Sequence, residues 1–343
     1  MQPEKLVIHD ETSLLLGNFF KNTSYSQIGV LVDNNTKKSC YGQIQNLLPP
    51  HFLIEVKSGE EFKNLKTCEE VWNQLTDHHF DRHALIIIVG GGVLGDLGGF
   101  CAATYKRGID FILVPTTLLA QVDASIGGKL GIDFLSYKNH IGVFQEPVST
   151  LISPTFLKTL PERELRSGFA EVIKHCLISD RTVWDRIRTQ SLKNQDWSRL
   201  IKHSAEFKYS VIRQDPKEKG LRKILNFGHT VGHAVESYFL EMPVRLFHGE
   251  AIAVGMICEA HIAFKKGLVK KEEMDMISGF IIEIFGKVDL PAAKPLMALM
   301  AQDKKNRGNK IFMALIEGIG KAVWDIEVSE SEIENALNYY ESL

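Results

Sequence analysis

The amino-acid sequence predicts an α/β domain followed by a helical domain. In the first half, short runs of β-branched residues alternate with helical patterns, which is typical of a mostly parallel sheet. From about Pro161 onward, long helical patterns dominate instead. Prolines and short polar stretches interrupt both of these sequence patterns within residues 145–162. We therefore expect a Rossmann-like α/β domain at residues 1–159 and an α-helical domain at residues 160–343.

The first domain is predicted to contain strands separated by helices. The predicted strands are residues 28–35, 51–56, 84–92 and 111–116. Ser58 and Glu61 suit a capping box at the start of the helix after the second strand. The apolar stripe of that helix consists of Phe62, Leu65, Trp72 and Leu75. Ligands of such sheets bind beyond the carboxyl ends of the strands.

The second domain is predicted to be built from amphipathic helices. The segments with helical periodicity are residues 162–178, 197–214, 229–239, 249–267 and 329–343. Ser329 is expected to cap the last of these helices. A cleft between the two domains is a favoured place for a ligand.

Composition and charge exclude several classes of protein. The 343-residue chain has a formal net charge of −2, so it offers no basic footprint for nucleic acid. Its most apolar run, residues 84–99, is too short and too broken by glycine to span a membrane, and its N-terminus lacks a signal-peptide pattern. The 5 cysteines form no CxxC pair, which indicates free thiols in a reducing compartment. We expect a cytoplasmic enzyme or binding protein.

A glycine-rich turn follows the third predicted strand. Gly90, Gly92 and Gly95 have GxGxxG spacing and open a predicted helix, where backbone N–H groups can approach a pyrophosphate. A turn made only for tight packing has the same pattern, so the motif alone leaves both interpretations open. The acidic strand end that usually follows this motif comes earlier here, at Asp33. If the turn binds a dinucleotide, the strand order is therefore not the common one.

Three basic residues, Arg107, Lys129 and Lys138, fall in turns around the same predicted sheet edge. A single lysine beside glycines is usually a solvated loop residue. Three basic side chains together suit a phosphate or a carboxylate. Asp123 and Asn139 lie in the same stretch of the sequence.

Glu171 and Lys174 lie three residues apart on one face of a predicted helix. An intrahelical ion pair is the simplest interpretation. Apolar neighbours such as Phe169 and Ile173 predict that the segment is buried. A buried carboxylate needs a cation or a metal ion as its partner.

Arg222, Asn226, His229 and His233 recur at steps of four, three and four, which predicts one helical stripe of polar groups. A lone histidine is usually a satisfied structural residue. A solvated stripe, however, would carry lysine and glutamate. Four such groups on one face therefore favour a functional site.

His248 begins a further predicted helix. Together with Glu171 and His229 it would form a His₂–carboxylate set for Zn²⁺ or a similar ion. The spacing leaves open whether His233 also binds the ion. The HExxH pattern is absent, because Thr230 stands in the place of its glutamate.

Several long motifs resemble the 3-dehydroquinate synthase family. They are residues 90–133, 160–175, 219–236 and 248–256, within a similarity that runs from about residue 28 to residues 303–320. The resemblance implies an NAD-binding α/β domain, a helical domain with a metal and substrate site, and a homodimer in which Arg107 reaches the neighbouring site. It also implies tightly held NAD⁺ and a divalent ion, Zn²⁺ or Co²⁺.

The implied reaction converts 3-deoxy-D-arabino-heptulosonate 7-phosphate into 3-dehydroquinate and phosphate. It combines transient oxidation at carbon 5, elimination of phosphate, re-reduction, ring opening and an intramolecular aldol closure. Because no net redox change occurs, the family is classed among carbon–oxygen lyases, and it acts in the shikimate pathway of aromatic amino-acid biosynthesis.

The resemblance assigns roles position by position. The implied metal ligands are Glu171, His229 and His248. The implied NAD contacts are Asp33, Asn34, Asn35, Glu60, Lys63, Gly91, Gly92, Val93, Asp96, Thr116, Thr117, Lys138, Phe156, Leu157, Lys158, Thr159 and Ser167. The implied substrate contacts are Arg107, Asp123, Lys129, Asn139, Lys174, Lys208, Arg222, Asn226, His233 and one of Lys304 and Lys305. The implied catalytic residues are Glu218 and His233, which transfer protons, and Lys129, Lys174, Arg222 and Asn226.

Other activities compete with this one. The nearest are sugar phosphate cyclases that make 2-deoxy-scyllo-inosose or epi-valiolone, against which Arg222 and Asn226 argue because those substrates lack a carboxylate. A dehydrogenase of the glycerol dehydrogenase type and a catalytically inactive NAD-binding regulator are further alternatives. Four residues differ from the family pattern, namely Leu130, Asp133, Tyr137 and His140.

Overall fold

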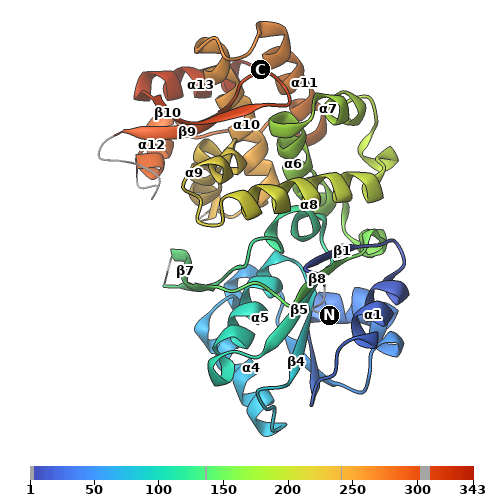
Figure 1. Ribbon diagram of the computed structural model, residues 1–343. Coiled ribbons are helices and arrows are strands. Elements are labelled where there is room, and N and C mark those ends of the chain that lie inside the picture. The colour runs from blue at the N-terminus through green and yellow to red at the C-terminus, as the bar shows by residue number, and fades with distance from the viewer. Residues whose placement is uncertain (1–3, 136, 241, 302–309) are drawn as a thin grey trace. The chain divides into compact units, whose positions relative to one another are not determined.

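Figure 1 shows the computed structural model, which describes residues 4–135, 137–240, 242–301 and 310–343. The chain divides into two compact units. The first contains Met1–Leu165 and Trp197–Ala205, and the second contains Arg166–Asp196 and Glu206–Leu343. The first unit is α/β and the second is mainly helical, as the sequence predicts. The boundary expected between residues 159 and 160 stays a prediction.

A parallel sheet of 6 strands, in the order β1-β8-β5-β4-β2-β3, forms the centre of the first unit. Its strands are β1 (Leu6–Ile8), β2 (Ile28–Asp33), β3 (Phe52–Val56), β4 (Leu85–Gly90), β5 (Asp110–Pro115) and β8 (Ser149–Ile152). The four strands predicted from the sequence are confirmed as β2 to β5. The direction of winding reverses between the neighbouring strands β2 and β4. Ligands of such sheets usually bind at this switch point, beyond the carboxyl ends of the strands.

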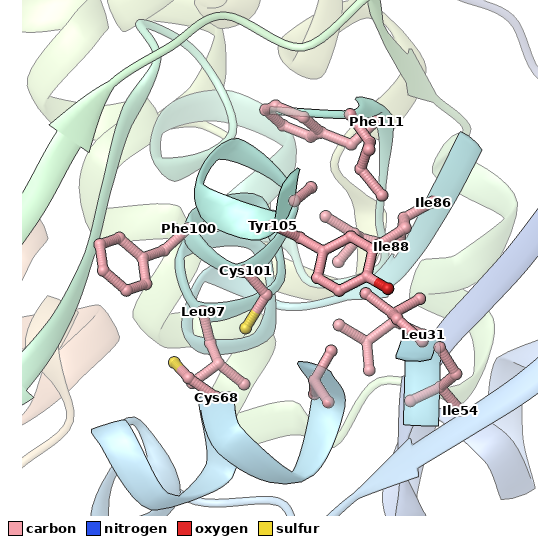
Figure 2. Packing of buried hydrophobic residues seen from close by; sticks show 14 of the residues in the cluster. Leu31, Ile54, Cys68, Ile86, Ile88, Leu97, Phe100, Cys101, Tyr105 and Phe111 are labelled. Atoms are coloured by element: carbon pink, nitrogen blue, oxygen red, sulfur yellow. The ribbon is translucent and has the colours of Figure 1, made fainter. Parts of the chain in front are cut away.

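Alternating side chains of the sheet form two hydrophobic cores. On β4, Ile86 and Ile88 face one core, and Leu85 and Ile87 face the other. The first core is closed by α4 (Leu65–Asp77) and α5 (Gly92–Thr104), and Figure 2 shows its packing. The second core includes side chains of α1 (Thr12–Lys21). Burial of each large aliphatic side chain contributes about 1.5–3 kcal/mol, so the sheet is held from both faces.

The helix after β3 begins later than expected. Gly59 has φ +122°, and a 3-10 turn, η3 (Glu60–Phe62), follows it. Asn64 caps α4 instead, since its side chain accepts a hydrogen bond from the Thr67 N–H. The predicted capping box of Ser58 and Glu61 is therefore wrong.

The remaining elements of the first unit are short. They are α2 (Asn34–Thr36), the π-helix η1 (Lys37–Tyr41), α3 (Gly42–Ile44), η2 (Gln45–Leu47), η4 (Tyr105–Arg107), the π-helix η5 (Ala120–Ala124), the hairpin of β6 (Lys129–Phe134) and β7 (Tyr137–Phe144), and η6 (Pro154–Thr159). The sequence did not predict the hairpin, which belongs to the segment that carries Lys129, Lys138 and Asn139.

Helices dominate the second unit. The helices from residue 162 onward are α6 (Glu162–Ser179), α7 (Arg181–Ile187), η7 (Leu192–Asn194), α8 (Trp197–Gln214), η8 (Leu221–Asn226), α9 (His229–Leu240), α10 (His248–Lys265), α11 (Lys271–Phe285), α12 (Ala293–Ala301) and α13 (Glu330–Ser342). Of these, the first residues of α6 and the first half of α8 belong to the first unit. The expected cap of the last helix is confirmed, since Ser329 forms a capping box with Glu332. A two-stranded hairpin, β9 (Ile311–Ile316) with β10 (Ala322–Val328), adds to the predicted helices.

Helix α10 lies at the core of this unit. Every residue from Gly249 to Ala263 is buried, as expected for a helix that is apolar on all sides. The backbone of two other segments approaches this helix closely at glycines. A Cβ added to Gly249 would lie 1.9 Å from the carbonyl oxygen of Ser167, and one added to Gly255 would lie 1.9 Å from that of Gly228.

The stripe of Arg222, Asn226, His229 and His233 is not one continuous helix. The first two residues lie on the 3-10 helix η8 and the last two on α9. Between them Gly228 has φ +79°, a conformation that favours glycine, and a Cβ there would lie 2.6 Å from Cγ of Met256. The close packing against α10 breaks the helix at this point.

Within the described residues, no helix is long and apolar enough to cross a membrane.

Candidate active site

Three side chains from three helices of the second unit converge. Glu171 lies in the middle of α6, and His229 and His248 are the first residues of α9 and α10. One ligand atom of each lies within 4.8 Å of the others. Oε1 of Glu171 is 3.5 Å from Nε2 of His229 and 3.5 Å from Nε2 of His248. The predicted His₂–carboxylate set is thus brought together in space.

This donor set fits a divalent metal ion. Ligand bonds of about 2.0–2.2 Å in a tetrahedron separate two ligand atoms by roughly 3.4 Å. The two separations of 3.5 Å from Glu171 match this value. Two imidazoles and one carboxylate also leave a fourth position for a ligand oxygen, as in catalytic zinc sites.

Burial and neighbouring charges shift the pKa values of the two histidines in opposite directions. Glu171 is fully buried and paired with the buried ammonium of Lys174. Burial, followed by the charge of Lys174, lowers the pKa of His229 well below its usual range. Burial alone would also lower the pKa of His248, but hydrogen bonds with Glu171 and Glu236 outweigh it and raise that pKa to about 10.

The outer nitrogens of both histidines have partners within the second unit. Nδ1 of His248 lies 3.1 Å from Oε2 of Glu236, and Nδ1 of His229 lies 3.0 Å from the carbonyl oxygen of Phe227. Such contacts fix the ring orientation of histidines that bind metals. They direct both Nε2 atoms toward Glu171.

His233 belongs to the same group of rings. Its ring centroid lies 5.0 Å from that of His229 and 6.0 Å from that of His248. It is exposed, whereas His229 is buried. His233, Glu236 and His248 form another group whose ligand atoms lie within 4.8 Å of one another. Nδ1 of His248 already contacts Glu236. We therefore interpret His233 and Glu236 as neighbours of the Glu171–His229–His248 set and not as a second metal site.

The 3-10 helix η8 and the loop before it carry three more of the predicted residues. Nδ2 of Asn226 donates a hydrogen bond of 2.8 Å to Oε1 of Glu218, and the guanidinium of buried Arg222 donates one to the carbonyl oxygen of Pro216. The carboxylate of Asp215 accepts hydrogen bonds from the backbone N–H groups of Lys219, Gly220 and Arg222. Asp215 therefore fixes this loop.

In the first unit, a pocket opens beside the glycine-rich turn. It is lined by residues that include Gly90, Gly91, Gly92, Asp96 and Lys129. A Cβ at Gly91 or at Gly92 would lie 3.0 Å from Thr117 or Ala124, respectively, so the turn has little room for side chains. The backbone N–H groups at the start of α5 can therefore approach a phosphate. This arrangement fits the pyrophosphate of a dinucleotide.

The buried lysine Lys63 joins two other predicted residues near this turn. Nζ of Lys63 lies 2.6 Å from Oδ2 of Asp96 and 2.6 Å from Oδ1 of Asn139. The backbone N–H of Asn139 in turn donates to Asp133, one of the residues that differ from the family pattern. Asp133 therefore helps to hold the hairpin on which Asn139 lies.

Several other predicted NAD contacts lie at the carboxyl ends of β2 and β5. Asp33 ends β2, and its carboxylate caps α2 by accepting hydrogen bonds from the N–H groups of Asn35 and Thr36. Asn34 accepts one from the Ser58 N–H. Thr116 and Thr117 follow β5. The ion pair of Lys138 with Glu60 spans 3.8 Å.

The remaining predicted residues fall in different places. Phe156 and Leu157 are buried on η6, whereas Lys158 and Thr159 are exposed there. The hydroxyl of Ser167, in the second unit, accepts a hydrogen bond from the Gly249 N–H. The predicted substrate residues of the first unit are Arg107, Asp123, Lys129 and Asn139, and those of the second unit are Lys174, Lys208, Arg222, Asn226 and His233. Lys304 and Lys305 lie outside the described residues.

Reasoning from the sequence missed two carboxylates next to the cluster, Glu236 and Glu259. Glu236 continues the polar stripe three residues after His233 on α9, so the same periodicity could have identified it. Glu259 is a fully buried carboxylate within the largely apolar helix α10. A buried carboxylate needs partners, and this argument, which drew attention to Glu171, applies equally to Glu259.

The fold and the cluster define a class of proteins with a nucleotide-binding α/β unit and a helical metal-binding unit. Two solved cyclases share the fold. The 2-epi-5-epi-valiolone synthase of Streptomyces hygroscopicus, with NAD⁺ and Zn²⁺ bound, has a TM-score of 0.87 and 27% identity over 99% of this chain and 97% of its own. A 2-deoxy-scyllo-inosose synthase in complex with carbaglucose-6-phosphate, NAD⁺ and Co²⁺ has a TM-score of 0.83 and 25% identity over 97% and 96%.

Sequence comparison places the chain within this class. The N-terminal and C-terminal family models of 3-dehydroquinate synthase match residues 53–167 and 168–306. The 3-dehydroquinate synthase of Sulfurovum sp. is 42% identical, covering 84% of this chain and 83% of its own. That of Parabacteroides distasonis is 34% identical over 99% and 98%. The chain belongs to the 3-dehydroquinate synthase family.

Proposed function

We propose that this chain is a 3-dehydroquinate synthase that converts 3-deoxy-D-arabino-heptulosonate 7-phosphate into 3-dehydroquinate and phosphate. The observation that carries the proposal is the convergence of Glu171, His229 and His248 beside the ammonium of Lys174, in a chain of this family. The reaction belongs to the shikimate pathway, which leads through chorismate to the aromatic amino acids.

Two bound groups complete the chemistry. Glu171, His229 and His248 would hold a divalent ion, Zn²⁺ or Co²⁺, and the glycine-rich turn with Asp33 would hold NAD⁺. When bound, the ion supplies Lewis acidity and NAD⁺ supplies a reversible hydride acceptor. Solved relatives of the same fold carry NAD⁺ with Zn²⁺ or Co²⁺.

The side chains of the second unit bind and orient the substrate. Arg222 and Asn226 bind its carboxylate, because a guanidinium and an amide offer several directed N–H donors. Lys174 and Lys208 add positive charge for its anionic and hydroxyl groups. Glu218 and His233 transfer protons, and the hydrogen bond from Asn226 holds the Glu218 carboxylate in place.

Elimination of phosphate requires little further chemistry from the protein. Oxidation at carbon 5 makes the neighbouring proton acidic, and the departing phosphate takes that proton as its bond to carbon breaks. In this step the role of the protein is to hold the substrate in the orientation that elimination requires. Among the residues of the first unit, Lys129 binds an anionic group of the substrate, and Asp123 and Asn139 bind its hydroxyl groups.

We further propose that the enzyme is a cytoplasmic homodimer. Arg107 is exposed at the end of η4, with a left-handed backbone (φ +70°), and we assign it a contact with the neighbouring subunit's site. The 5 cysteines are free and buried, which suits a reducing compartment. Light scattering that returned the mass of a single chain would contradict the dimer.

The carboxylate-binding role distinguishes this function from those of related cyclases. Protein loaded with Zn²⁺ or Co²⁺ and NAD⁺ is expected to release phosphate from the heptulosonate phosphate and not from glucose 6-phosphate, which has no carboxylate. A chelator should abolish the release, because the ion contributes several kcal/mol of transition-state stabilisation. Activity confined to the sugar phosphate without a carboxylate would assign the chain to another cyclase.

A further inference from the structure

Glu259 is a fully buried carboxylate whose position links two of the converging helices. It lies on α10, eleven residues after His248, which is roughly 16 Å along the helix axis. Its Oε2 accepts a hydrogen bond of 2.6 Å from the Gly228 N–H. Its Oε1 accepts hydrogen bonds of 3.0 Å from Thr230 and 3.2 Å from Val231.

These are three of the four N–H groups that the start of an α-helix leaves without a partner inside the helix. They flank His229, the first residue of α9. Burial of a carboxylate is costly. Here three charge-assisted hydrogen bonds and the positive end of the α9 dipole offset that cost. Glu259 therefore acts as a helix cap supplied by a neighbouring helix.

This cap fixes the orientation of His229. Nδ1 of His229 lies 3.0 Å from the carbonyl oxygen of Phe227, and the next N–H along the chain, that of Gly228, is the one held most closely by Glu259. Gly255, one turn before Glu259 on α10, allows the backbone of Gly228 to approach closely. The backbone that orients the His229 ring is thus held from α10.

Helix α10 therefore acts on both histidines of the cluster. It carries His248 at its first residue and orients His229 through Glu259. We propose that Glu259 is a positioning residue that couples the two histidine ligands and thereby sets the affinity and the geometry of the metal site. This inference rests on the proposed function, in that it takes Glu171, His229 and His248 to bind a divalent ion.

The test is a titration of the full-length, metal-free protein with Co²⁺, monitored by calorimetry and by the visible absorption of the bound ion. In Glu259→Gln, one acceptor oxygen becomes an NH₂ group that faces a backbone N–H. We expect the Co²⁺ affinity to fall on the order of 10–100-fold, as for other residues that support metal ligands, and the cobalt spectrum to change.

The matched control is Asp180→Asn. Asp180 caps α7 in the same unit by accepting hydrogen bonds from the N–H groups of Thr182 and Val183, and α7 carries no proposed ligand. This variant should melt at a lower temperature than the parent protein, but its Co²⁺ affinity and cobalt spectrum should be unchanged. If Glu259→Gln also kept both, Glu259 would be a structural cap only and the inference would be wrong.

Two further variants make the test decisive. If Glu259→Gln does not fold, Glu259→Asp keeps the charge but is one methylene shorter. A weaker affinity with an altered spectrum would then support the inference, and an unchanged affinity and spectrum would overturn it. Glu171→Ala tests the metal site itself. If it retained full Co²⁺ affinity, the proposed site would be wrong, whatever the result at Glu259.

Discussion

His229 and His233 lie four residues apart on α9 but have different surroundings. His229 is buried, and its two nitrogens point toward Glu171 and toward the carbonyl of Phe227. His233 is exposed, with its ring 5.0 Å from that of His229. The helical spacing therefore brings both side chains to one site, where we assign metal binding to the first and proton transfer to the second.

We expect His229→Ala to lose both metal binding and turnover. His233→Ala should retain the metal, because Glu171, His229 and His248 remain, and lose about 10²–10⁴-fold in rate, as is usual for a missing acid–base group. Metal content by atomic emission and phosphate release would be measured on the same samples. Loss of metal from His233→Ala would refute this division of roles.

How well each residue could be predicted depends on how its partners lie in the sequence. Glu171 and the histidines were identified because buried carboxylates and polar helical stripes are unusual in composition. Their convergence could not be derived from spacing, since they lie on three helices. The supporting groups were harder to identify, because Phe227 contributes a backbone carbonyl and Asp215 contacts backbone N–H groups. Neither contact leaves a pattern of side chains in the sequence.

At the scale of elements, the site depends on how closely α10 can approach α6. Gly249 follows His248 directly and donates its N–H to the Ser167 hydroxyl. A Cβ there would lie 1.9 Å from the Ser167 carbonyl oxygen, an atom of the rigid α6 backbone. Any side chain would therefore separate His248 from Glu171.

We expect Gly249→Ala to weaken Co²⁺ binding by on the order of 10-fold or more, since the distance between the Glu171 and His248 ligand atoms must increase. The matched control is Gly279→Ala in α11, where an added Cβ meets nothing within 4 Å. That variant should gain about 0.5–1 kcal/mol in the free energy of unfolding and keep its affinity. Equal Co²⁺ affinity in both variants would contradict the role given to this close approach.

The loop before η8 should show a pH-dependent contribution to stability. Hydrogen bonds from the N–H groups of Lys219 and Gly220 lower the pKa of Asp215 from its ordinary value of 3.8. The carboxylate therefore stabilises the fold above that value, and the contribution is lost as the pH falls through the lowered pKa of the folded protein.

Asp215→Asn should thus melt at a lower temperature than the parent protein at neutral pH, and the difference should shrink below about pH 4. Melting curves across this range, monitored by circular dichroism, would measure it. A difference that stayed constant down to the most acidic pH at which both proteins fold would show that the charge of Asp215 contributes nothing.

Secondary structure was predictable where one periodicity holds over a whole element. The four strands β2 to β5 and the long helices after residue 161 follow from their apolar patterns. The errors have local causes. Gly59 delays the start of α4 to the cap at Asn64, and the packing of Gly228 against α10 breaks the polar stripe. The two hairpins, β6–β7 and β9–β10, were missed.

At the scale of the whole molecule, the two units carry different parts of the proposed reaction. The first contains the glycine-rich turn with its pocket, and the second contains the proposed metal ligands Glu171, His229 and His248. A dehydrogenase that uses a nicotinamide cofactor and a metal ion needs the same two parts. What separates the activities is the fate of the hydride, which a cyclase returns to its substrate.

The most direct test follows phosphate and NADH together. Protein loaded with the divalent ion and NAD⁺ is mixed with excess heptulosonate phosphate, and phosphate release and NADH absorbance are recorded over many turnovers. We predict that phosphate accumulates with every turnover, while NADH never exceeds the amount of enzyme. NADH that rose in step with the substrate consumed would show net oxidation and would contradict the proposed function.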